Sequence, residues 1–171
     1  MIDKVQTLWP EIALFVTTCV VMVLGLSRDR STRRLVGVVS GLGLAAALVL
    51  ALVTSPQLAG PLPALAAYGK AVIAAIGLLL LLLAAGTVDR DYEASVARGE
   101  PFDPLKGNRA EFASFFLFSL TGLMLCVSAT DLIWLFLALE LTSLPTYVMV
   151  AISSKRSRSL EAGVKYFFLG A

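Results

Sequence analysis

The chain has 171 residues, a net charge of +2 and a mean hydropathy of +0.85; 58% of its residues are hydrophobic and 15% are charged. Soluble domains average about 45–50% apolar and about 25% charged residues, so this composition excludes a disordered protein and a nucleic-acid-binding domain with a basic face. Two cysteines and no histidine exclude a disulfide-stapled secreted module and a zinc or haem site built from histidines of this chain. The apolar residues lie in long blocks, which indicates a membrane protein.

About 20 mostly apolar residues cross about 30 Å of hydrocarbon as a helix, and the sequence contains five such blocks and the beginning of a sixth. We predict an all-α fold, a polytopic transmembrane helix bundle with five full spans plus the start of a sixth, as one membrane domain over 1–171. The first block precedes its positive cluster, which favours a retained helix over a signal peptide. The predicted spans are 11–27, 35–53, 68–88, 112–129, 132–152 and the incomplete 159–171.

Positive charges are distributed unequally between the connections. Those after the first, third and fifth blocks carry eleven Lys and Arg residues, whereas the other side carries only Lys4. The positive-inside rule then places the N-terminus outside and these three connections in the cytoplasm. The second connection, 54–67, contains three prolines and is expected to be an irregular turn. The third, 89–109, is expected to be a surface loop with a short helical start.

Several residues of the first five blocks predict local contacts. Gly37 and Gly41 form a G-x-x-x-G pair, which favours close helix packing. Lys70 lies two residues inside the third block, where we expect its long side chain to snorkel to the outer interface. Asp131 stands in a two-residue outer turn and is expected to cap the fifth helix.

Glu140 is the one charged residue in the fifth block and lies about 12 Å below the outer end of its helix. A charge at the bilayer centre costs about 2.5–3.5 kcal/mol, so such residues are functional candidates. Ser143 and Tyr147 follow on the same helix face, and Pro145 frees the carbonyl of residue 141 and is expected to bend the helix. These groups predict a polar stripe that holds ordered water. The alternative is a protonated Glu140 that only hydrogen-bonds a neighbouring helix.

Lys165 lies about 9 Å from the cytoplasmic end of the sixth block. Two interpretations are open. Glu161 precedes it by four residues, a spacing that favours a local ion pair, and the lysine can also snorkel. Alternatively, burial lets Lys165 titrate and carry a proton. Because the depths of Glu140 and Lys165 differ by about 9 Å along the membrane normal, we expect no direct salt bridge between them.

The last third of the chain resembles a known family. The sequence contains Leu-Glu-Leu-Thr-Ser-Leu-Pro-Thr-Tyr-Val over 139–148 and Glu-Ala-Gly-Val-Lys-Tyr-Phe-Phe-Leu-Gly-Ala over 161–171. With Asn-Arg-Ala-Glu-Phe over 108–112, these runs resemble subunit N of NADH-quinone oxidoreductase, respiratory complex I, within the proton-antiporter-like family. Thr130 and Gly163 depart from the usual pattern, without touching the proposed chemistry. The family has more than twice as many spans, so the resemblance implies an N-terminal fragment of a longer subunit.

The resemblance implies a function in proton translocation across a bacterial inner membrane. The subunit would be a non-redox part of the translocase, in contact with lipid and the other membrane subunits and without nucleic acid. It would bind no cofactor; NADH, FMN, iron-sulfur clusters and quinone would be used by the rest of the complex. Glu140 would be the gating acid and Lys165 a relay member, with Ser143, Pro145, Tyr147 and Lys70 in support. The alternatives are a sodium/proton antiporter-type subunit and a non-pumping structural membrane module.

Overall fold

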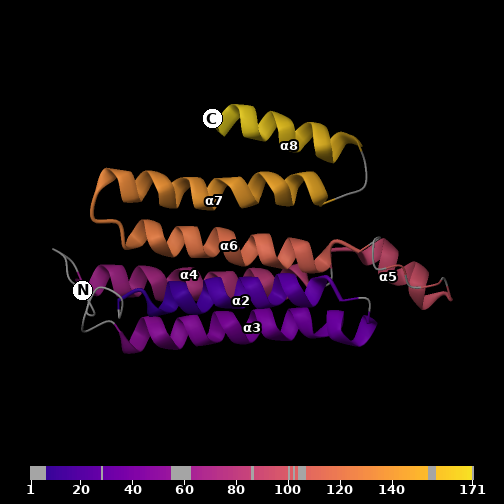
Figure 1. Cartoon of the computed structure of the whole chain (residues 1–171), viewed down its shortest axis with the longest axis horizontal. Coiled ribbons are helices and arrows are strands. Elements are labelled where there is room, and N and C mark those ends of the chain that lie inside the picture. The colour runs from indigo at the N-terminus through magenta and orange to yellow at the C-terminus, as the bar shows by residue number, and fades with distance from the viewer. Residues whose placement is uncertain are drawn as a thin grey trace.

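The computed structural model describes residues 7–27, 29–54, 63–85, 87–99, 101, 103, 107–153 and 157–170, and over these residues all regular structure is helical. The all-α prediction is therefore confirmed. Most helices run alongside one another, and the short α5 extends beyond one end of the bundle (Figure 1). The helices are α2 (Trp9–Gly25), α3 (Arg30–Val53), α4 (Pro63–Ala84), α5 (Arg90–Ala97), α6 (Arg109–Val127), α7 (Leu132–Ile152) and α8 (Ser157–Gly170).

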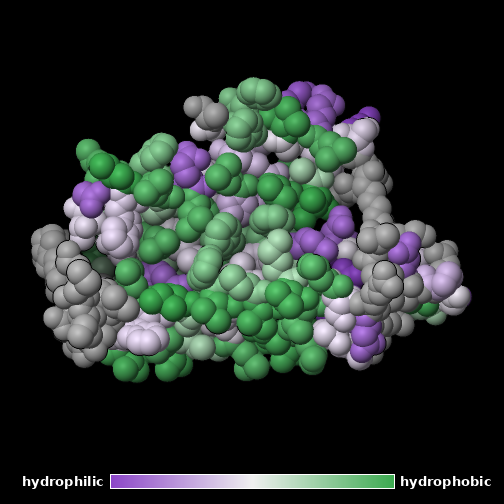
Figure 2. Space-filling model, in the orientation of Figure 1, coloured by the Kyte–Doolittle hydropathy of each residue, from purple (hydrophilic) through white to green (hydrophobic). Residues whose placement is uncertain are grey.

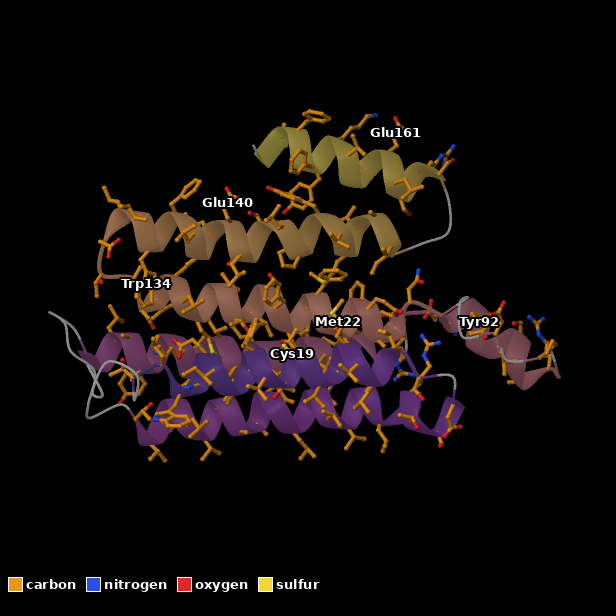
Figure 3. All side chains as sticks on the ribbon, viewed as in Figure 1. Cys19, Met22, Tyr92, Trp134, Glu140 and Glu161 are labelled. Carbon is orange, nitrogen blue, oxygen red and sulfur yellow. The ribbon has the colours of Figure 1, made fainter. Side chains whose placement is uncertain are left out.

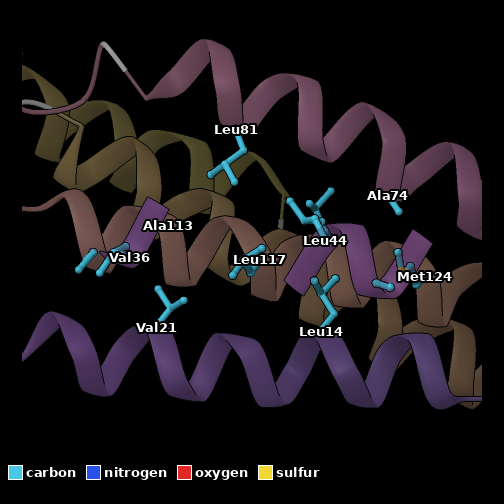
Figure 4. Packing of buried hydrophobic residues seen from close by; sticks show 12 residues of the cluster. Leu14, Val21, Val36, Leu44, Ala74, Leu81, Ala113, Leu117 and Met124 are labelled. Carbon is cyan, nitrogen blue, oxygen red and sulfur yellow. The ribbon is translucent and has the colours of Figure 1, made fainter. Parts of the chain in front are cut away.

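Four helices form a compact unit around a shared core. Helix α2 packs against α3 and α6, and α4 packs against the same two helices, so α2 and α4 occupy opposite corners of the unit. The core between them consists of small and branched apolar side chains (Figure 4). Its fully buried members include Leu14, Val21, Leu44, Leu117 and Met124.

Helices α7 and α8 lie outside this four-helix unit. Helix α7 packs against α6 on one side and α8 on the other (Figure 1). Only 11% of its most apolar stretch is buried, whereas half of the corresponding stretch of α6 is buried. Much of the α7 surface is therefore open along its length, including the region that contains Glu140.

Within the part of the chain that the structure describes, four helices are long and apolar enough to cross a membrane: Ser31–Val53, Leu65–Ala84, Arg109–Val127 and Leu132–Ile152. Helix α2 is apolar but shorter, with 17 residues. Hydrophobic residues cover most of the bundle side seen in Figure 2, and hydrophilic residues gather mainly toward its ends. The described residues thus belong to a multi-pass membrane protein with four candidate spans and one shorter apolar helix. The predicted five full spans are not confirmed, because α2 is shorter than the other four.

Local sequence explains where two of these helices begin. Asp131 accepts a hydrogen bond from the Trp134 backbone N–H at 2.8 Å, which confirms its predicted role as the cap of α7. Asp29 caps α3 in the same way by accepting from the Ser31 N–H at 3.3 Å. Each carboxylate satisfies an N–H that has no partner within its own helix.

Close helix approach occurs at glycines other than the predicted pair. A Cβ added at Gly41 would meet no atom within 4 Å, and one at Gly37 only the end of the Arg109 side chain. The prediction of close packing at G-x-x-x-G was therefore wrong for the described residues. The tight contacts are instead at Gly43, where a Cβ would meet Thr17 of α2, and at Gly122, where it would meet α7. The motif has the right spacing, but its face does not meet another helix closely.

At the end of the bundle near α5, polar contacts fasten the connections to the helices. The Arg33 guanidinium donates to the Gly107 carbonyl at 2.8 Å, and the Asn108 backbone N–H donates to Asp89 Oδ2 at 2.5 Å. The Asn108 side chain also donates to the carbonyl of Ile152, the last residue of α7, at 3.1 Å. The region predicted as a surface loop with a helical start contains the eight-residue α5 and is held to the bundle by these bonds.

Candidate functional site

Glu140 lies near the middle of α7, on the side of the helix that faces away from α6 (Figure 3). The opposite side of α7 packs against the bundle and contains Ala138 and Pro145, which are both buried. The Glu140 side chain is only half-buried, and within the described residues its carboxylate has no hydrogen-bond partner. An unpaired acid at this depth is free to bind a proton or a partner from outside these helices.

Three of the residues predicted to support Glu140 lie with it on α7: Ser143, Pro145 and Tyr147. The Ser143 hydroxyl donates to the Leu139 carbonyl at 3.0 Å, with the Glu140 carbonyl as an alternative acceptor at 3.3 Å. Helix α7 continues through Pro145 without interruption. Tyr147 packs with edge-on geometry against two aromatic rings of α8, with ring centroids 4.9 and 5.6 Å away. The hydroxyl of Ser143 thus binds backbone, and Tyr147 joins α7 to α8.

Lys165 forms the local ion pair that its spacing favours. Its Nζ lies 2.6 Å from Glu161 Oε1, and both side chains are well exposed, at 74% and 63%. Figure 3 shows Glu161 on the side of α8 that faces away from α7. Within the described residues no ion pair or hydrogen bond joins Lys165 to Glu140. The structure therefore does not bring together the two residues predicted to carry the proton.

Lys70 lies in the interior of the bundle and not at its surface. Only 1% of its side chain is exposed, and its Nζ is 2.6 Å from Oε1 of Glu11, which is 3% exposed. The prediction that Lys70 snorkels to the interface was therefore wrong. The carboxylate of Glu11 compensates the buried ammonium, because the attraction between opposite charges grows as the surroundings become less polar and offsets part of the cost of desolvation.

Helices α2, α4 and α6 all contribute to this buried site. Besides the ion pair, Lys70 of α4 donates a hydrogen bond to the Thr7 carbonyl, just before α2, at 2.8 Å. Ser128, which ends α6, donates to Glu11 Oε1 at 2.8 Å, with the Met124 carbonyl as an alternative acceptor at 3.2 Å. The ion pair thus connects α2 and α4 across the unit, although each packs mainly against α3 and α6. We refer to Glu11, Lys70 and Ser128 as the buried triad.

The sequence reasoning missed Glu11 and Ser128 as members of a site. A usable signal was present, because the predicted topology places the starts of the first and third blocks on the same side of the membrane. Glu11 and Lys70 each stand near such a start, and their charges are opposite. Two opposite charges near the same end of two apolar helices in one bundle are expected to pair.

Comparison with known proteins agrees with this architecture. A family profile described as "NADH:quinone oxidoreductase/Mrp antiporter, TM" matches residues 129–171, which include Glu140 and Lys165. NADH-quinone oxidoreductase subunit N of Rhodospirillum rubrum is 37% identical over 170 residues, which are 95% of this chain and 32% of that protein. Subunit N 1 of Rhizobium meliloti is 33% identical over 175 residues, covering all of this chain and 34% of the relative. The chain is homologous to subunit N of NADH-quinone oxidoreductase.

The homology to subunit N extends well beyond the motifs of the last third, since it includes α2 to α4 and the buried triad. A further relative, F(420)H(2) dehydrogenase subunit N of Methanosarcina mazei, is 28% identical over 185 residues, covering 99% of this chain and 34% of that protein. The chain spans about a third of the length of these subunit N relatives. The resemblance drawn from the sequence motifs is thereby confirmed.

Proposed function

We propose that this chain is a membrane part of a proton-translocating NADH-quinone oxidoreductase and moves protons from the cytoplasmic to the outer side. Electron transfer from NADH to quinone in other subunits would supply the energy. The observation that carries the proposal is a half-buried, unpaired carboxylate, Glu140, midway along an apolar helix of a chain homologous to subunit N. Placing an acid at such a depth costs free energy, so such acids are rare and usually belong to a transport pathway.

The chemistry proposed for Glu140 is charge coupling. A carboxylate near an ammonium favours the charged form of the lysine, and neutralising or moving the acid favours release of the proton from that lysine. In this proposal Glu140 is the gating acid and Lys165 a relay member. Because Lys165 pairs with Glu161, the coupling between Glu140 and Lys165 would pass through water. Ser143, Pro145 and Tyr147 support α7 around the acid.

We further propose that this chain has no redox role and binds no NADH, FMN, iron-sulfur cluster or quinone. In support, two relatives, 37% and 28% identical to this chain, are subunits of complexes named for two different donors, NADH and F(420)H(2). A subunit shared by such complexes is poorly placed to recognise the donor. Its partners would be the lipid bilayer and the other membrane subunits, in a bacterial inner membrane, with the N-terminus outside and connections 1, 3 and 5 in the cytoplasm.

The test is NADH-driven proton uptake into inverted membrane vesicles that contain the assembled complex, comparing the native protein with Glu140→Gln. We expect assembly to persist while pumping and quinone reduction fall together. Glu111→Gln is the matched control, because it makes the same change in the first turn of α6, where the carboxylate lies 3.8 Å from Arg33 and its side chain is 42% exposed. Full pumping by Glu140→Gln would refute the gating role and leave the chain as a packing module.

A sodium/proton antiporter-type subunit is the second candidate, because the matching family profile names the Mrp antiporter as well. The same vesicles separate the two functions. Proton uptake that needs NADH and continues without sodium supports the oxidoreductase subunit. Proton movement that follows an imposed sodium gradient, without NADH, supports the antiporter.

A further inference from the structure

We propose that Glu11 and Lys70 form a second proton-exchanging site in this membrane domain, separate from Glu140. The site lies where α2 and α4 begin and α6 ends, whereas Glu140 lies midway along α7, on its side away from α6. The inference rests on the proposed role in proton translocation and adds a second group to it. Its geometry comes from three helices that do not include α7 or α8.

The energetics of burial argue that the ion pair is more than a packing device. Both charges are almost fully removed from solvent, and the desolvation of such a pair often cancels its attraction. Apolar side chains of similar volume frequently hold helices together equally well at this kind of position. Ionisable residues inside membrane helices mark transport pathways in most cases, which gives the pair a functional reading.

The hydrogen bonding of Glu11 identifies the atom that would take up the proton. Oε1 forms the ion pair with Lys70 at 2.6 Å and accepts a hydrogen bond from Ser128 at 2.8 Å. Oε2 is equally buried, yet within the described residues it has no donor. A buried carboxylate oxygen without a donor is costly, and a proton or a water molecule relieves that cost.

The exchange step is a simple proton transfer. A hydronium ion at this end of the bundle transfers a proton to Oε2: one of its O–H bonds breaks and leaves water, and the new O–H bond makes Glu11 a neutral acid. Lys70 remains an ammonium ion held by Oε1 and the Thr7 carbonyl. Release breaks the same O–H bond and restores the ion pair. Glu11 is the third residue of α2 and Ser128 directly follows α6, so the pair lies close to this end of the bundle, where the exchange would take place.

The other described charged residues of the surrounding helices do not take over the role of the pair. The described charged residues of α3 and α6, Arg33, Arg109 and Glu111, belong to the opposite end of these helices. Asp131 follows Ser128 closely, but it is exposed and caps α7. The pH response of this end of the bundle is therefore expected to come from Glu11 and Lys70 themselves.

The decisive variant replaces both charges at once, Glu11→Leu with Lys70→Met, in the assembled complex. If the ion pair is purely structural, the complex with the two apolar residues is expected to assemble and to pump as the unaltered complex does. A proton-exchanging site predicts that the complex assembles but moves fewer protons per NADH oxidised. Pumping equal to that of the unaltered complex overturns the inference. Glu140→Gln, measured in parallel, distinguishes the two proposals. If Glu140→Gln loses pumping while the double variant pumps fully, the second site at Glu11 and Lys70 is overturned and the role proposed for Glu140 stands.

Ser128→Ala is the second variant, and it decides the question if the double variant does not assemble. It keeps both charges and removes one donor to Glu11 Oε1. Because that donor favours the charged carboxylate, its loss is expected to shift the pH profile of pumping toward higher pH. Ser114→Ala, which removes an α6 hydroxyl that donates to the Ala110 carbonyl of the same helix, is the matched control and should leave the profile in place. An unshifted profile in Ser128→Ala would overturn the inference.

Discussion

Gly122 of α6 and Thr142 of α7 lie closer together than any side chain at position 122 would allow. A Cβ at Gly122 would stand 2.5 Å from Thr142 Oγ1 and 2.7 Å from its backbone nitrogen. One turn earlier, the Ser119 hydroxyl donates to the Thr142 carbonyl at 3.0 Å. These contacts fix which side of α7 rests on α6. They therefore also fix the direction in which Glu140 points, away from α6.

Gly122→Ala should destabilise the protein by about 1–3 kcal/mol, the usual cost of overpacking, because α7 backbone would have to move. The measurement is the thermal denaturation midpoint of the purified complex. Gly41→Ala is the control, since a Cβ there meets nothing within 4 Å and alanine favours the helix by about 0.5–1 kcal/mol. Equal stability of the two variants would show that α6 and α7 are not in close contact.

The two Lys–Glu ion pairs should differ greatly in their contribution to stability, although both have N–O distances of 2.6 Å. Lys70→Ala leaves Glu11 buried and unpaired, at a cost of about 3–5 kcal/mol. Lys165→Ala removes an exposed pair that contributes only about 0.3–0.5 kcal/mol. Thermal denaturation of both variants provides the comparison. A similar small loss for each would mean that Lys70 is not buried against Glu11.

Asp131→Ala should cost about 1 kcal/mol, because the first turn of α7 loses the acceptor of the Trp134 N–H. Asp131→Asn keeps a side-chain oxygen at the same place and should retain most of the stability. Amide hydrogen exchange over residues 132–136 reports directly on this turn. Faster exchange is expected in the alanine variant only, and unchanged protection there would exclude capping by Asp131.

The start of α3 should loosen in acid. The hydroxyl and then the backbone N–H of Ser31 donate to Asp29, and these bonds lower the pKa of its carboxyl below the usual value. A carboxyl with a lowered pKa in the folded state stabilises the cap above its ordinary pKa, and that contribution disappears as the pH falls through the lowered value. Hydrogen exchange at residues 31–33, corrected for intrinsic rates, should therefore accelerate in acid. Asp29→Asn does not titrate and should abolish this pH dependence.

The sequence predicted the secondary structure well because helix formation is mostly local. Long apolar blocks correspond to α3, α4, α6 and α7, and Asp131 caps α7 as expected. Helix α3 nevertheless begins at Arg30, five residues before its apolar block. Polar residues extend a helix beyond its apolar part where the helix end reaches water. The length of the apolar block alone therefore does not predict where the helix begins.

The site was harder to predict, because burial in a helical bundle depends on helix rotation. The position of Lys70 in its apolar block is the same whether its side chain points to the interface or to Glu11. The packing of α2 beside α6 decides between these two orientations. Lys165 shows the reverse case. Its partner Glu161 lies one turn away on the same helix, so the pair is visible in the sequence.

The sequence by itself determined the class of the protein, its apolar helices, the Asp131 cap and its kinship with subunit N, since these depend on composition and on neighbours within a few residues. Only the tertiary structure showed that Glu11, Lys70 and Ser128 meet, that Gly122 carries the close contact, and that Glu140 faces away from α6. Residues up to 117 positions apart form these contacts. Their meeting depends on how each helix is rotated against its neighbours, which is a property of the packed bundle.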